Sequence, residues 1–220
     1  MPTLLFDVYG TLLDVHGVAL RAEALFPGKG RALSMLWRDK QLQYTWLRTL
    51  AGRHADFWQV TGEALDYAGE SLSLPLSPSL RDELLGLYLR LPAWPDAAAA
   101  LRDLRGRGYR LATLSNGTPQ MLEAALGAAG LRGLLDAVLS IEAAGRYKVA
   151  PEAYRIAVEQ FGGPPSDFVL VSSNGWDVAG AGHFGFRTFW VNRAGAPVER
   201  LGIAPSGIGA SLSDLHAWLG

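Results

Sequence analysis

Short runs of apolar residues recur along the chain, and most are followed by a stretch with the apolar spacing of a helix. Continuous apolar runs of this length are typical of strands buried on both faces, and strands that alternate with helices predict a parallel sheet. We therefore expect an α/β fold with a Rossmann-like parallel sheet. The predicted strands cover residues 4–6, 109–114, 137–140, 168–171 and 188–191.

The region between the first two predicted strands has a different pattern. It is long, contains no convincing strand, and repeats apolar residues at helical spacing, as in Leu33, Leu36 and Trp37. We expect a helical cap at residues 15–95, inserted into a catalytic core made of residues 1–14 and 96–220. Breaks between the cap helices are expected at 28–30 and 74–78, and a return linker at 91–95.

Two glycine-rich segments lie near the C-terminal end. Residues 202–209 are expected to form a Gly/Pro/Ser loop before a short last helix at 213–219. The string from Gly180 to Gly185 has the spacing G-x-G-x-x-G, but a dinucleotide-binding fingerprint must lie between a strand and the start of a helix. This string comes after the expected helix that follows the fourth strand, so we interpret it as a helix ending and turn.

Composition excludes several classes of protein. The 220 residues are 49% hydrophobic with a net charge of −1, and no Lys/Arg block marks a nucleic-acid binder. The chain has no cysteine, which excludes a disulfide scaffold, thiol catalysis and Cys-based zinc sites. The N-terminus does not read as a signal peptide, and no apolar stretch approaches the ~18–20 residues of a membrane span. We expect a cytoplasmic protein without a membrane or nucleic-acid partner.

Polar residues stand at the ends of successive predicted strands. Asp7 ends the first strand and Ser115 follows the second, Lys148 comes after the third past a loop, and the string from Ser172 to Asp177 ends the fourth. In an open α/β sheet, ligands bind at the carboxyl ends of the strands. One polar strand end is often only a helix cap or a turn, but four in succession predict a binding or catalytic site.

These motifs resemble the four ordered motifs of the haloacid dehalogenase superfamily. Their order along the chain is Asp7-x-Tyr9-Gly10-Thr11, Ser115-Asn116-Gly117, Lys148, and Ser172-Ser173-Asn174-x-x-Asp177. The resemblance is closest to the L-2-haloacid dehalogenase family, because residues 36–42 and 44–48 are similar to that family's cap segment, as is the Ser-Ser-Asn-x-Trp-Asp string. It implies a Rossmann-like core with a helical cap.

The phosphatases of this superfamily use residues that this chain lacks. They need a second Asp two positions after the nucleophile as general acid and base, and Tyr9 stands there. They also need an acidic pair near the fourth strand to hold magnesium, a cation that prefers oxygen ligands. Ser172 and Ser173 occupy the position of the first carboxylate, and only Asp177 remains. We therefore expect no required metal and no cofactor.

The resemblance implies a carboxylate nucleophile that attacks carbon. Asp7 forms an ester intermediate with a halogenated carboxylic acid, and Lys148 keeps Asp7 ionised because an opposite charge favours the charged form. Ser115, with backbone N–H groups after Asp7, binds the substrate carboxylate, and Asn116 also contacts the substrate. Arg38 of the cap takes the halide. Attack opposite the halogen inverts the carbon, so an L-2-haloacid gives a D-2-hydroxy acid.

Further roles follow from the same resemblance. Asp177 positions the water that hydrolyses the ester, helped by Ser172 and Asn174, while the Thr11 hydroxyl supports the nucleophile and Tyr154 bonds near the same site. The candidates for an apolar wall around the substrate are Tyr9, Leu42, Phe57 and Trp176.

Each role has a plainer structural alternative. Arg38 is also typical of a helix-surface ion pair with Asp39 or Glu23. Lys148 could be a solvated lysine, Phe57 a residue of core packing, and Asp177 a first-turn helix carboxylate. The family usually has Pro directly after the lysine, whereas this chain has Val149, so we expect a slightly different presentation of Lys148.

Three other functions stay open at this point. They are a phosphatase or phosphonatase of the same superfamily, a dehalogenase that prefers fluoroacetate, and an inactive binding module. The resemblance also predicts a homodimer through exposed apolar residues of the cap, for which packing of the cap helices on each other is the alternative. The residues of the predicted dimer face are Leu36, Trp37, Tyr44 and Trp46.

Overall fold

The computed structural model describes residues 1–220 and contains one six-stranded sheet in the order β3-β2-β1-β4-β5-β6. All neighbouring strands are parallel. Each of the five predicted strands is present, with ends that differ by no more than one residue. The strands are β1 Thr3–Phe6, β2 Arg110–Ser115, β3 Ala137–Ser140, β4 Phe168–Ser172, β5 Arg187–Val191 and β6 Gly207–Gly209.

The edge strand β6 corrects the prediction of a loop over residues 202–209. It has only three residues, two of them glycines, so it carries no apolar run that would indicate a strand. Both glycines are needed for packing. A Cβ atom at Gly207 would lie 2.4 Å from the indole nitrogen of Trp218, and one at Gly209 would lie 2.7 Å from the Phe189 ring. The strand is therefore set by tertiary packing rather than by local sequence.

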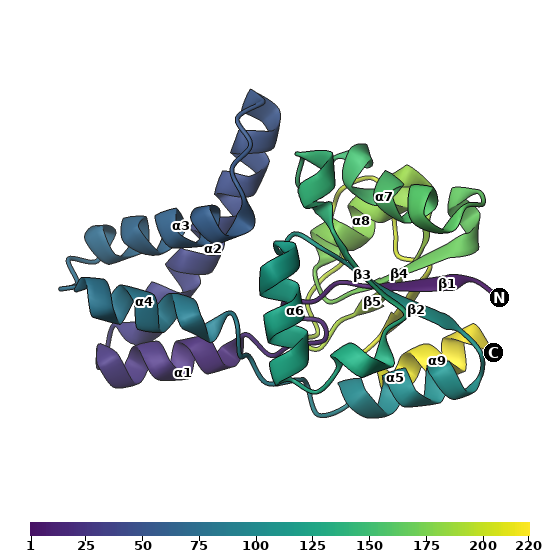
Figure 1. Cartoon of the computed structure of the whole chain (residues 1–220), viewed down its shortest axis with the longest axis horizontal. Helices are drawn as coiled ribbons and strands as arrows, with labels where there is room; N and C mark the ends of the chain where they lie inside the picture. The colour runs from purple at the N-terminus through teal and green to yellow at the C-terminus, as the bar shows by residue number, and fades with distance from the viewer.

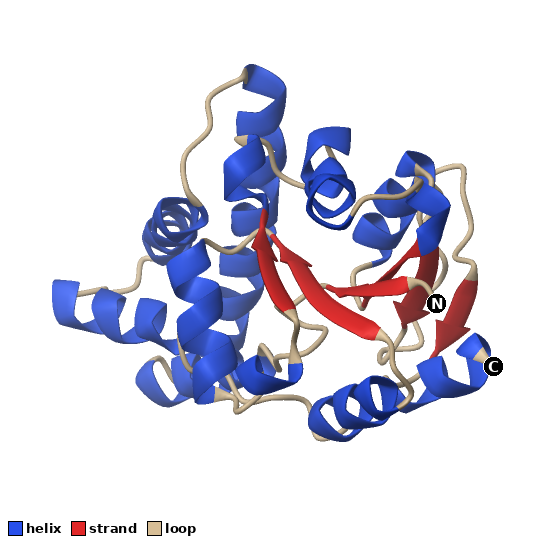
Figure 2. Ribbon diagram, turned by 45° about the vertical axis from the view of Figure 1, so that its right-hand side comes forward, coloured by secondary structure: helices blue, strands red, loops and turns tan.

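Five helices accompany the sheet. Helices α7 and α8 lie on one face, while α5 and α9 lie on the other (Figures 1 and 2). Thr118 caps α6 by accepting a hydrogen bond from the Met121 N–H at 3.2 Å, and Pro119 follows at the first helical position. The bounds are α5 Ala97–Gly106, α6 Pro119–Ala128, α7 Pro151–Phe161, α8 Gly175–Phe184 and α9 Ser213–Leu219.

Four more helices follow β1 and stand to one side of the sheet (Figure 1). The two predicted breaks lie between α1 and α2 and between α3 and α4. A third break, which was not predicted, follows Gly52, whose φ of 64° ends α2. The bounds are α1 His16–Leu25, α2 Gly30–Ala51, α3 Phe57–Ser71 and α4 Pro78–Leu87.

Two adjacent chain segments connect these four helices to the sheet. The Asp14 N–H donates to the Pro92 carbonyl at 2.8 Å, and the Trp94 N–H donates to the Leu12 carbonyl at 2.9 Å. Leu13 and Ala93 form an antiparallel bridge between them. The outgoing and returning linkers thus lie side by side, so the four helices are joined to the rest of the molecule at one place.

Two expectations from the sequence are wrong in detail. Helix α8 continues to Phe184, so Gly180 and Gly182 lie inside it, and only Gly185, with φ of 106°, ends the helix. Trp37 is fully buried, because its indole N–H donates to the Thr61 carbonyl at 2.8 Å within the same chain. Trp37 therefore cannot contribute to an exposed dimer face, and packing between neighbouring helices explains it.

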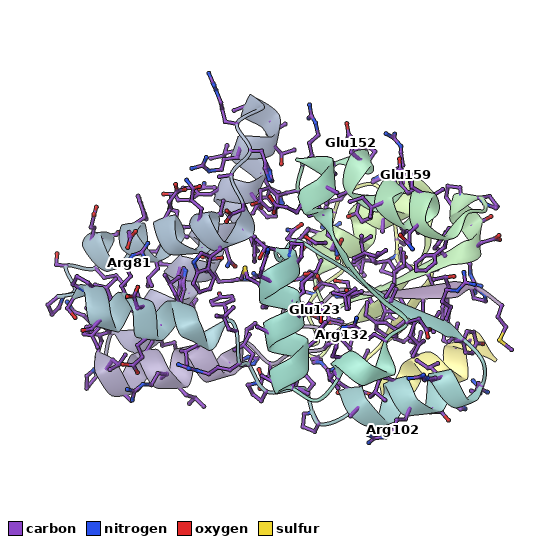
Figure 3. All side chains as sticks on the ribbon, in the orientation of Figure 1. Arg81, Arg102, Glu123, Arg132, Glu152 and Glu159 are labelled. Carbon is purple, nitrogen blue, oxygen red and sulfur yellow. The ribbon has the colours of Figure 1, made fainter.

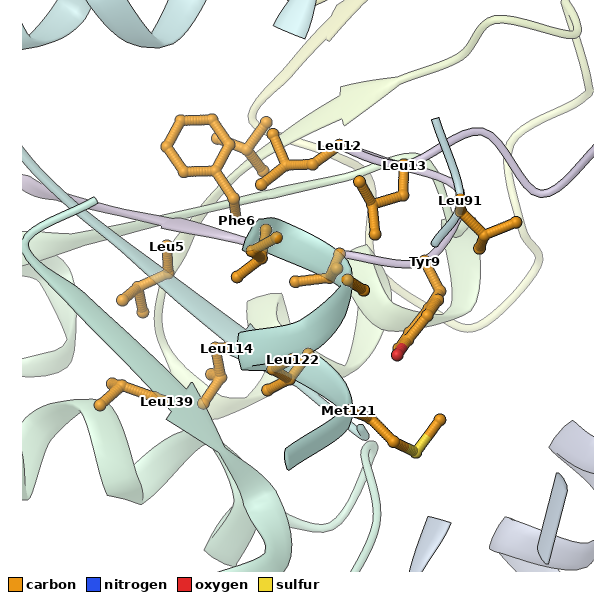
Figure 4. Close-up of a cluster of buried hydrophobic side chains, with 14 of the residues drawn as sticks. Leu5, Phe6, Tyr9, Leu12, Leu13, Leu91, Leu114, Met121, Leu122 and Leu139 are labelled. Carbon is orange, nitrogen blue, oxygen red and sulfur yellow. The ribbon is translucent and has the colours of Figure 1, made fainter. Parts of the chain in front are cut away.

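Apolar side chains of the central strands and helix α6 form a continuous core. Figure 4 shows Leu5, Leu114 and Leu139 from three neighbouring strands, with Leu122 of α6 against them. Most charged side chains lie on the outside of the molecule, as Figure 3 shows for Arg102 at its lower edge and Glu152 at its upper edge. None of the helices is long and apolar enough to span a membrane.

Candidate active site

Three neighbouring strands bring the predicted polar residues together. Asp7 directly follows β1, while Ser115 and Ser172 are the last residues of β2 and β4, which flank β1 in the sheet. All three strands run parallel, so these residues meet at the same edge. The site lies at the carboxyl end of the sheet, where ligands bind in open α/β folds.

The Asp7 carboxylate is held by side chains from three segments and is only 6% exposed. One oxygen, Oδ2, accepts hydrogen bonds from the Thr11 hydroxyl at 3.0 Å and from the Asn174 side-chain amide at 2.9 Å. The other oxygen, Oδ1, lies 3.4 Å from the Lys148 ammonium. Oδ1 therefore has a single long contact, whereas Oδ2 is fixed by two donors.

A tight turn after β1 places Thr11 next to Asp7. Gly10 has φ of 92°, a conformation that side-chain-bearing residues rarely adopt. A Cβ atom there would also lie 3.4 Å from the Ser173 hydroxyl. The turn is thus compatible with glycine, and it brings Thr11 back within reach of both Asp7 and Ser173.

Lys148 is buried between two carboxylates, and its side chain is 1% exposed. Its ammonium lies 2.7 Å from Asp177 Oδ2 and 3.4 Å from Asp7 Oδ1. Burial alone lowers the pKa of Lys148, but the charges of Asp177 and Asp7 outweigh burial and raise that pKa above its usual value. The alternative of a solvated surface lysine is wrong.

Asp177 lies in the first turn of α8 and is fully buried. Its Oδ2 binds Lys148, and its Oδ1 accepts a hydrogen bond from the Tyr154 hydroxyl at 2.8 Å. Burial raises the pKa of the Asp177 carboxyl, and the Lys148 ammonium acts in the opposite direction. In this arrangement both carboxylate oxygens orient other side chains, and Asp177 fixes the position of Lys148.

Three predicted site residues bind backbone groups of the surrounding loops. The Ser115 hydroxyl accepts from the Gly117 N–H at 3.3 Å, and the Ser172 hydroxyl accepts from the Asn174 N–H at 3.1 Å. The side-chain amide oxygen of Asn116 accepts from the Lys148 backbone N–H at 3.2 Å. These contacts shape the loops that carry Asn174 and Lys148. With Val149 in the place of the family's usual proline, the Lys148–Val149 peptide bond is cis, and Lys148 still reaches both carboxylates.

Sequence reasoning missed the part played by Ser173. Its backbone N–H donates to the Thr11 hydroxyl oxygen at 2.9 Å, and its own hydroxyl lies 3.1 Å from that oxygen. Ser173 therefore orients the Thr11 hydroxyl, which in turn donates to Asp7. The sequence contains a signal, since Ser173 lies within the motif Ser172-Ser173-Asn174, but that motif gave roles to Ser172 and Asn174 and left Ser173 only as the place of a missing carboxylate.

A cavity of about 560 Å³ lies at the carboxyl edge of the sheet, next to the inserted helices α1 and α2, and neither Asp7 nor Lys148 is among its lining residues. Asn174 and Tyr9 form its wall beside Asp7, with Arg38 of α2 and Trp176 also in the wall. Leu42 and Phe57 lie outside the wall. Phe57 is buried and packs against the rings of Tyr9 and Tyr147, which favours its packing alternative.

Arg38 enters the cavity without a carboxylate partner. Its guanidinium donates to the Gln41 side-chain oxygen at 2.6 Å, and Gln41 is held in turn by Thr61 at 2.7 Å. The alternative of a surface ion pair is wrong, because Glu23 instead accepts from backbone N–H groups such as that of Arg31. Arg38 therefore keeps its charge for an anion in the cavity.

The hydroxyl of Tyr9 is buried in the same wall and has no hydrogen-bond partner. Burial, together with the nearby Tyr88 hydroxyl, raises the pKa of Tyr9 above its usual value, so the phenol stays protonated. Tyr9 cannot serve as the carboxylate acid and base that a phosphatase needs at this position.

The site does not fit a magnesium ion. No group of three or more His, Asp or Glu side chains in the chain is arranged to hold a metal. The position between Asp7 and Asp177 is taken by the Lys148 ammonium, which satisfies both carboxylates. Ser173, which is turned toward Thr11, offers a hydroxyl rather than a carboxylate.

Comparison with known proteins places this site in a family. A model of the haloacid dehalogenase-like hydrolases matches residues 1–185. The chain belongs to the haloacid dehalogenase-like hydrolase family, and within it the chain groups with the (S)-2-haloacid dehalogenases. The (S)-2-haloacid dehalogenase 4A of Burkholderia cepacia is 47% identical over 194 residues, which are 88% of this chain and 84% of that protein.

Solved structures give the same result. The crystal structure of one L-2-haloacid dehalogenase is 49% identical in sequence and superposes with a TM-score of 0.98. The match covers 100% of this chain and 98% of the other. The L-2-haloacid dehalogenase from Xanthobacter autotrophicus with chloropropionic acid covalently bound is 38% identical, with a TM-score of 0.92. That match covers 100% of this chain and 98% of the other.

Proposed function

We propose that this enzyme hydrolyses L-2-haloacids to D-2-hydroxy acids through an ester of Asp7, without a metal ion. The observation that carries the proposal is the pairing of a buried nucleophile with an unpaired cation. The Asp7 side chain is bound by Lys148, Thr11 and Asn174, and the wall of the adjoining cavity includes Arg38, which no carboxylate contacts.

In the first step, a carboxylate oxygen of Asp7 attacks C2 of the haloacid. The C–O ester bond forms as the carbon–halogen bond breaks, and the halide leaves with the bonding electron pair toward Arg38. Oδ1 is better suited to attack than Oδ2, because Oδ2 already accepts two hydrogen bonds. Attack opposite the leaving halide inverts C2, which turns the L-substrate into a D-product.

In the second step, water attacks the carbonyl carbon of the Asp7 ester. The bond between that carbon and the ester oxygen breaks, Asp7 regains its carboxylate with one oxygen from water, and the hydroxy acid takes the oxygen that attacked. The donors Thr11 and Asn174 bind Oδ2 and so stabilise the negative charge that develops there. We propose that Asp177 positions the water, with Ser172 and Asn174 helping.

Contacts with the substrate carboxylate stay a prediction. Ser115 and Asn116 are buried and lie outside the cavity wall, where they bind backbone N–H groups of Gly117 and Lys148. Their proximity to the loop after β2 supports a role in shaping the end of the site that receives the carboxylate.

We propose that residues 15–95 act as a cap over a core formed by residues 1–14 and 96–220. The paired linkers support this division, since the Asp14 N–H binds the Pro92 carbonyl where the four helices leave and rejoin the core. The cap supplies Arg38, so closure of the cap on the core completes the anion site.

We also propose a homodimer through the cap. Leu36, Tyr44 and Trp46 of α2 remain half-buried, and Leu47 and Leu50 on the same helix are 53% and 85% exposed. Size-exclusion chromatography with light scattering should give a dimeric mass that Leu47→Glu lowers. A strictly monomeric wild-type protein would contradict the proposal.

The function is tested by incubating the enzyme with L- and D-2-chloropropionate in the presence of EDTA and measuring chloride release. We expect release from the L-isomer alone, and none from Asp7→Asn. Absence of release from both isomers and from chloroacetate and fluoroacetate, together with magnesium-dependent hydrolysis of p-nitrophenyl phosphate, would replace the proposal with a phosphatase. Detectable turnover of any haloacid excludes an inactive binding module.

A further inference from the structure

A pair of buried polar side chains joins helices α2 and α3 behind Arg38. Gln41 of α2 and Thr61 of α3 are both completely buried, and neither lines the cavity. Arg38 and Gln41 are three positions apart on α2, so their side chains lie on the same face of that helix. Burial of polar groups costs free energy unless their hydrogen bonds are satisfied, and apolar residues are the usual occupants of such positions.

The hydrogen bonds of this pair run in one direction. The Thr61 hydroxyl donates its only proton to the Phe57 carbonyl at 2.6 Å, so toward Gln41 it can only accept. The group of Gln41 that faces Thr61, at 2.7 Å, must therefore be the side-chain NH2. The Gln41 side-chain oxygen then faces Arg38 and accepts from the guanidinium at 2.6 Å. The direction of the Thr61 hydroxyl thus decides which end of Gln41 meets the arginine.

These contacts are not needed to hold the two helices together. The Trp37 indole N–H already joins α2 to the Thr61 carbonyl at 2.8 Å, and apolar side chains are buried along both helices. What Gln41 adds is the contact with Arg38. It is the only hydrogen bond that the Arg38 side chain makes within the protein, so it sets the direction in which the other N–H donors of the guanidinium point.

Gln41 is neutral, and so are the phenols that neighbour Arg38. Burial raises the pKa of Tyr9 and of Tyr88 above the usual value, while the nearby Arg38 charge acts in the opposite direction, so both phenols stay uncharged. A glutamate in place of Gln41 would reach the same guanidinium nitrogen and cancel its charge. Glutamine holds the guanidinium in place and leaves the charge for another anion.

We propose that Gln41, held by Thr61, is a positioning residue that directs Arg38 toward the departing halide without neutralising the guanidinium. This inference rests on the proposed function, in which the halide leaves toward Arg38. Gln41 acts through the guanidinium and does not touch the substrate. The buried polar pair between α2 and α3 is thereby part of the halide site, although it lies outside the cavity wall.

Two substitutions of similar volume at Gln41 separate its charge from its hydrogen bond. Gln41→Glu keeps the acceptor, and the Thr61 hydroxyl can turn to donate to the new carboxylate, so the fold should be retained. Because Arg38 is then paired, the single-turnover rate of chloride release from L-2-chloropropionate should fall about a hundredfold. Gln41→Met removes the acceptor and keeps the free charge, so we expect a loss of about tenfold. A Gln41→Glu enzyme that is as fast as the wild type, or faster than Gln41→Met, would overturn the proposal.

The identity of the leaving halide distinguishes the positioning of Arg38 from a general structural effect. Chloride is a poorer leaving group than bromide, so its departure depends more on stabilisation by the guanidinium. Both Gln41 variants should therefore lose more rate on L-2-chloropropionate than on L-2-bromopropionate, and the ratio of the bromo to the chloro rate should rise above that of the wild type. Loss of folded enzyme would lower both rates equally. An unchanged ratio would contradict the proposal.

Two threonine substitutions give a matched comparison. Thr61 and Thr45 are both fully buried, and each hydroxyl donates to a backbone carbonyl of its own helix at 2.6 Å. Only Thr61 also accepts from Gln41. Thr61→Val should lower the chloride-release rate about two- to tenfold and raise the bromo-to-chloro ratio, whereas Thr45→Val should leave both near the wild-type values. Equal effects of the two substitutions would overturn the proposal.

Chloride binding without turnover separates this inference from the reaction itself. Broadening of the ³⁵Cl NMR line reports chloride that exchanges on and off the protein. We expect excess broadening with the wild type and with Thr45→Val, and its loss in both Arg38→Gln and Gln41→Glu. Equal broadening by the wild type and Gln41→Glu would overturn the role of Gln41 even if dehalogenation is confirmed. Broadening that depends on Gln41, without turnover of any haloacid, would instead overturn only the proposed reaction.

Discussion

Replacement of Lys148 by methionine is the most informative perturbation of the site. The side chain is 1% exposed and is the only cation in contact with Asp7 and Asp177. Methionine keeps much of the volume and removes the charge, which leaves two carboxylates buried without a counter-ion. Breaking a buried ion pair in this way costs about 3–5 kcal/mol of stability. For a chain of this length, that corresponds to a fall in Tm of roughly 6–20 °C.

The loss should depend on pH in a defined direction. Without Lys148, the pKa of the buried Asp177 carboxyl rises further above its unfolded value of about 3.9. A group with a raised folded pKa destabilises the fold increasingly as pH rises and ceases to do so below its unfolded pKa. The variant should therefore be most unstable near neutral pH and should approach the wild type as the pH falls toward 4.

Urea unfolding at pH 8 and pH 5 measures both effects, with chloride release measured on the same preparations. We expect the free-energy difference between the wild type and Lys148→Met to be largest at pH 8, and dehalogenation to be abolished. Lys148→Arg keeps the charge and is the matched control. A difference below about 0.5 kcal/mol at both pH values would refute the assignment of Lys148 as the counter-ion of two ionised carboxylates.

Three further changes follow from single contacts. Tyr154→Phe leaves one oxygen of Asp177 without its donor and should lower the unfolding free energy by about 1.5–3 kcal/mol in urea titrations, with a smaller loss at acid pH. Arg193→Gln removes the partner of Asp96, whose pKa is lowered because hydrogen bonds from Arg193 and the Leu212 N–H outweigh burial. The wild type should keep this stabilisation above about pH 4 and lose it as the pH falls through the lowered pKa, whereas thermal unfolding of the variant should lack that dependence. Thr11→Ala removes a hydrogen-bond donor to the Asp7 carboxylate and should lower kcat for chloride release about tenfold or more. Thr11→Ser keeps the hydroxyl and should retain most of the wild-type kcat.

The parts of the fold that periodicity determines could be predicted from the sequence. The strands ending at Phe6 and Ser172 are continuous apolar runs, and the start of α6 is marked by Thr118 and Pro119. The strand β6 could not be predicted, because glycine has low strand propensity. Gly207 and Gly209 fit there because a Cβ atom at these positions would clash with Trp218 and Phe189. Long-range packing of this kind leaves no local pattern.

The site was predictable as a set of residues, and its detailed contacts were not. The resemblance named Asp7, Lys148 and Asp177, and the structure brings all three within hydrogen-bonding contact. It did not indicate that Ser173 holds Thr11, because that contact joins positions 162 residues apart. Nor could it separate Phe57, which packs against the rings of Tyr9 and Tyr147, from Trp176, which reaches the cavity, since both are aromatic residues at unremarkable spacing.

The most direct test of the central claim follows the oxygen atoms. A single turnover of L-2-chloropropionate by excess enzyme in H2¹⁸O, followed by proteolysis and mass spectrometry, shows where the solvent oxygen is incorporated. If Asp7 forms the ester and water attacks its carbonyl carbon, the label appears in the Asp7 peptide and the released D-lactate is unlabelled. Labelled lactate with an unlabelled Asp7 peptide would mean that water attacks the substrate directly, and would contradict the account.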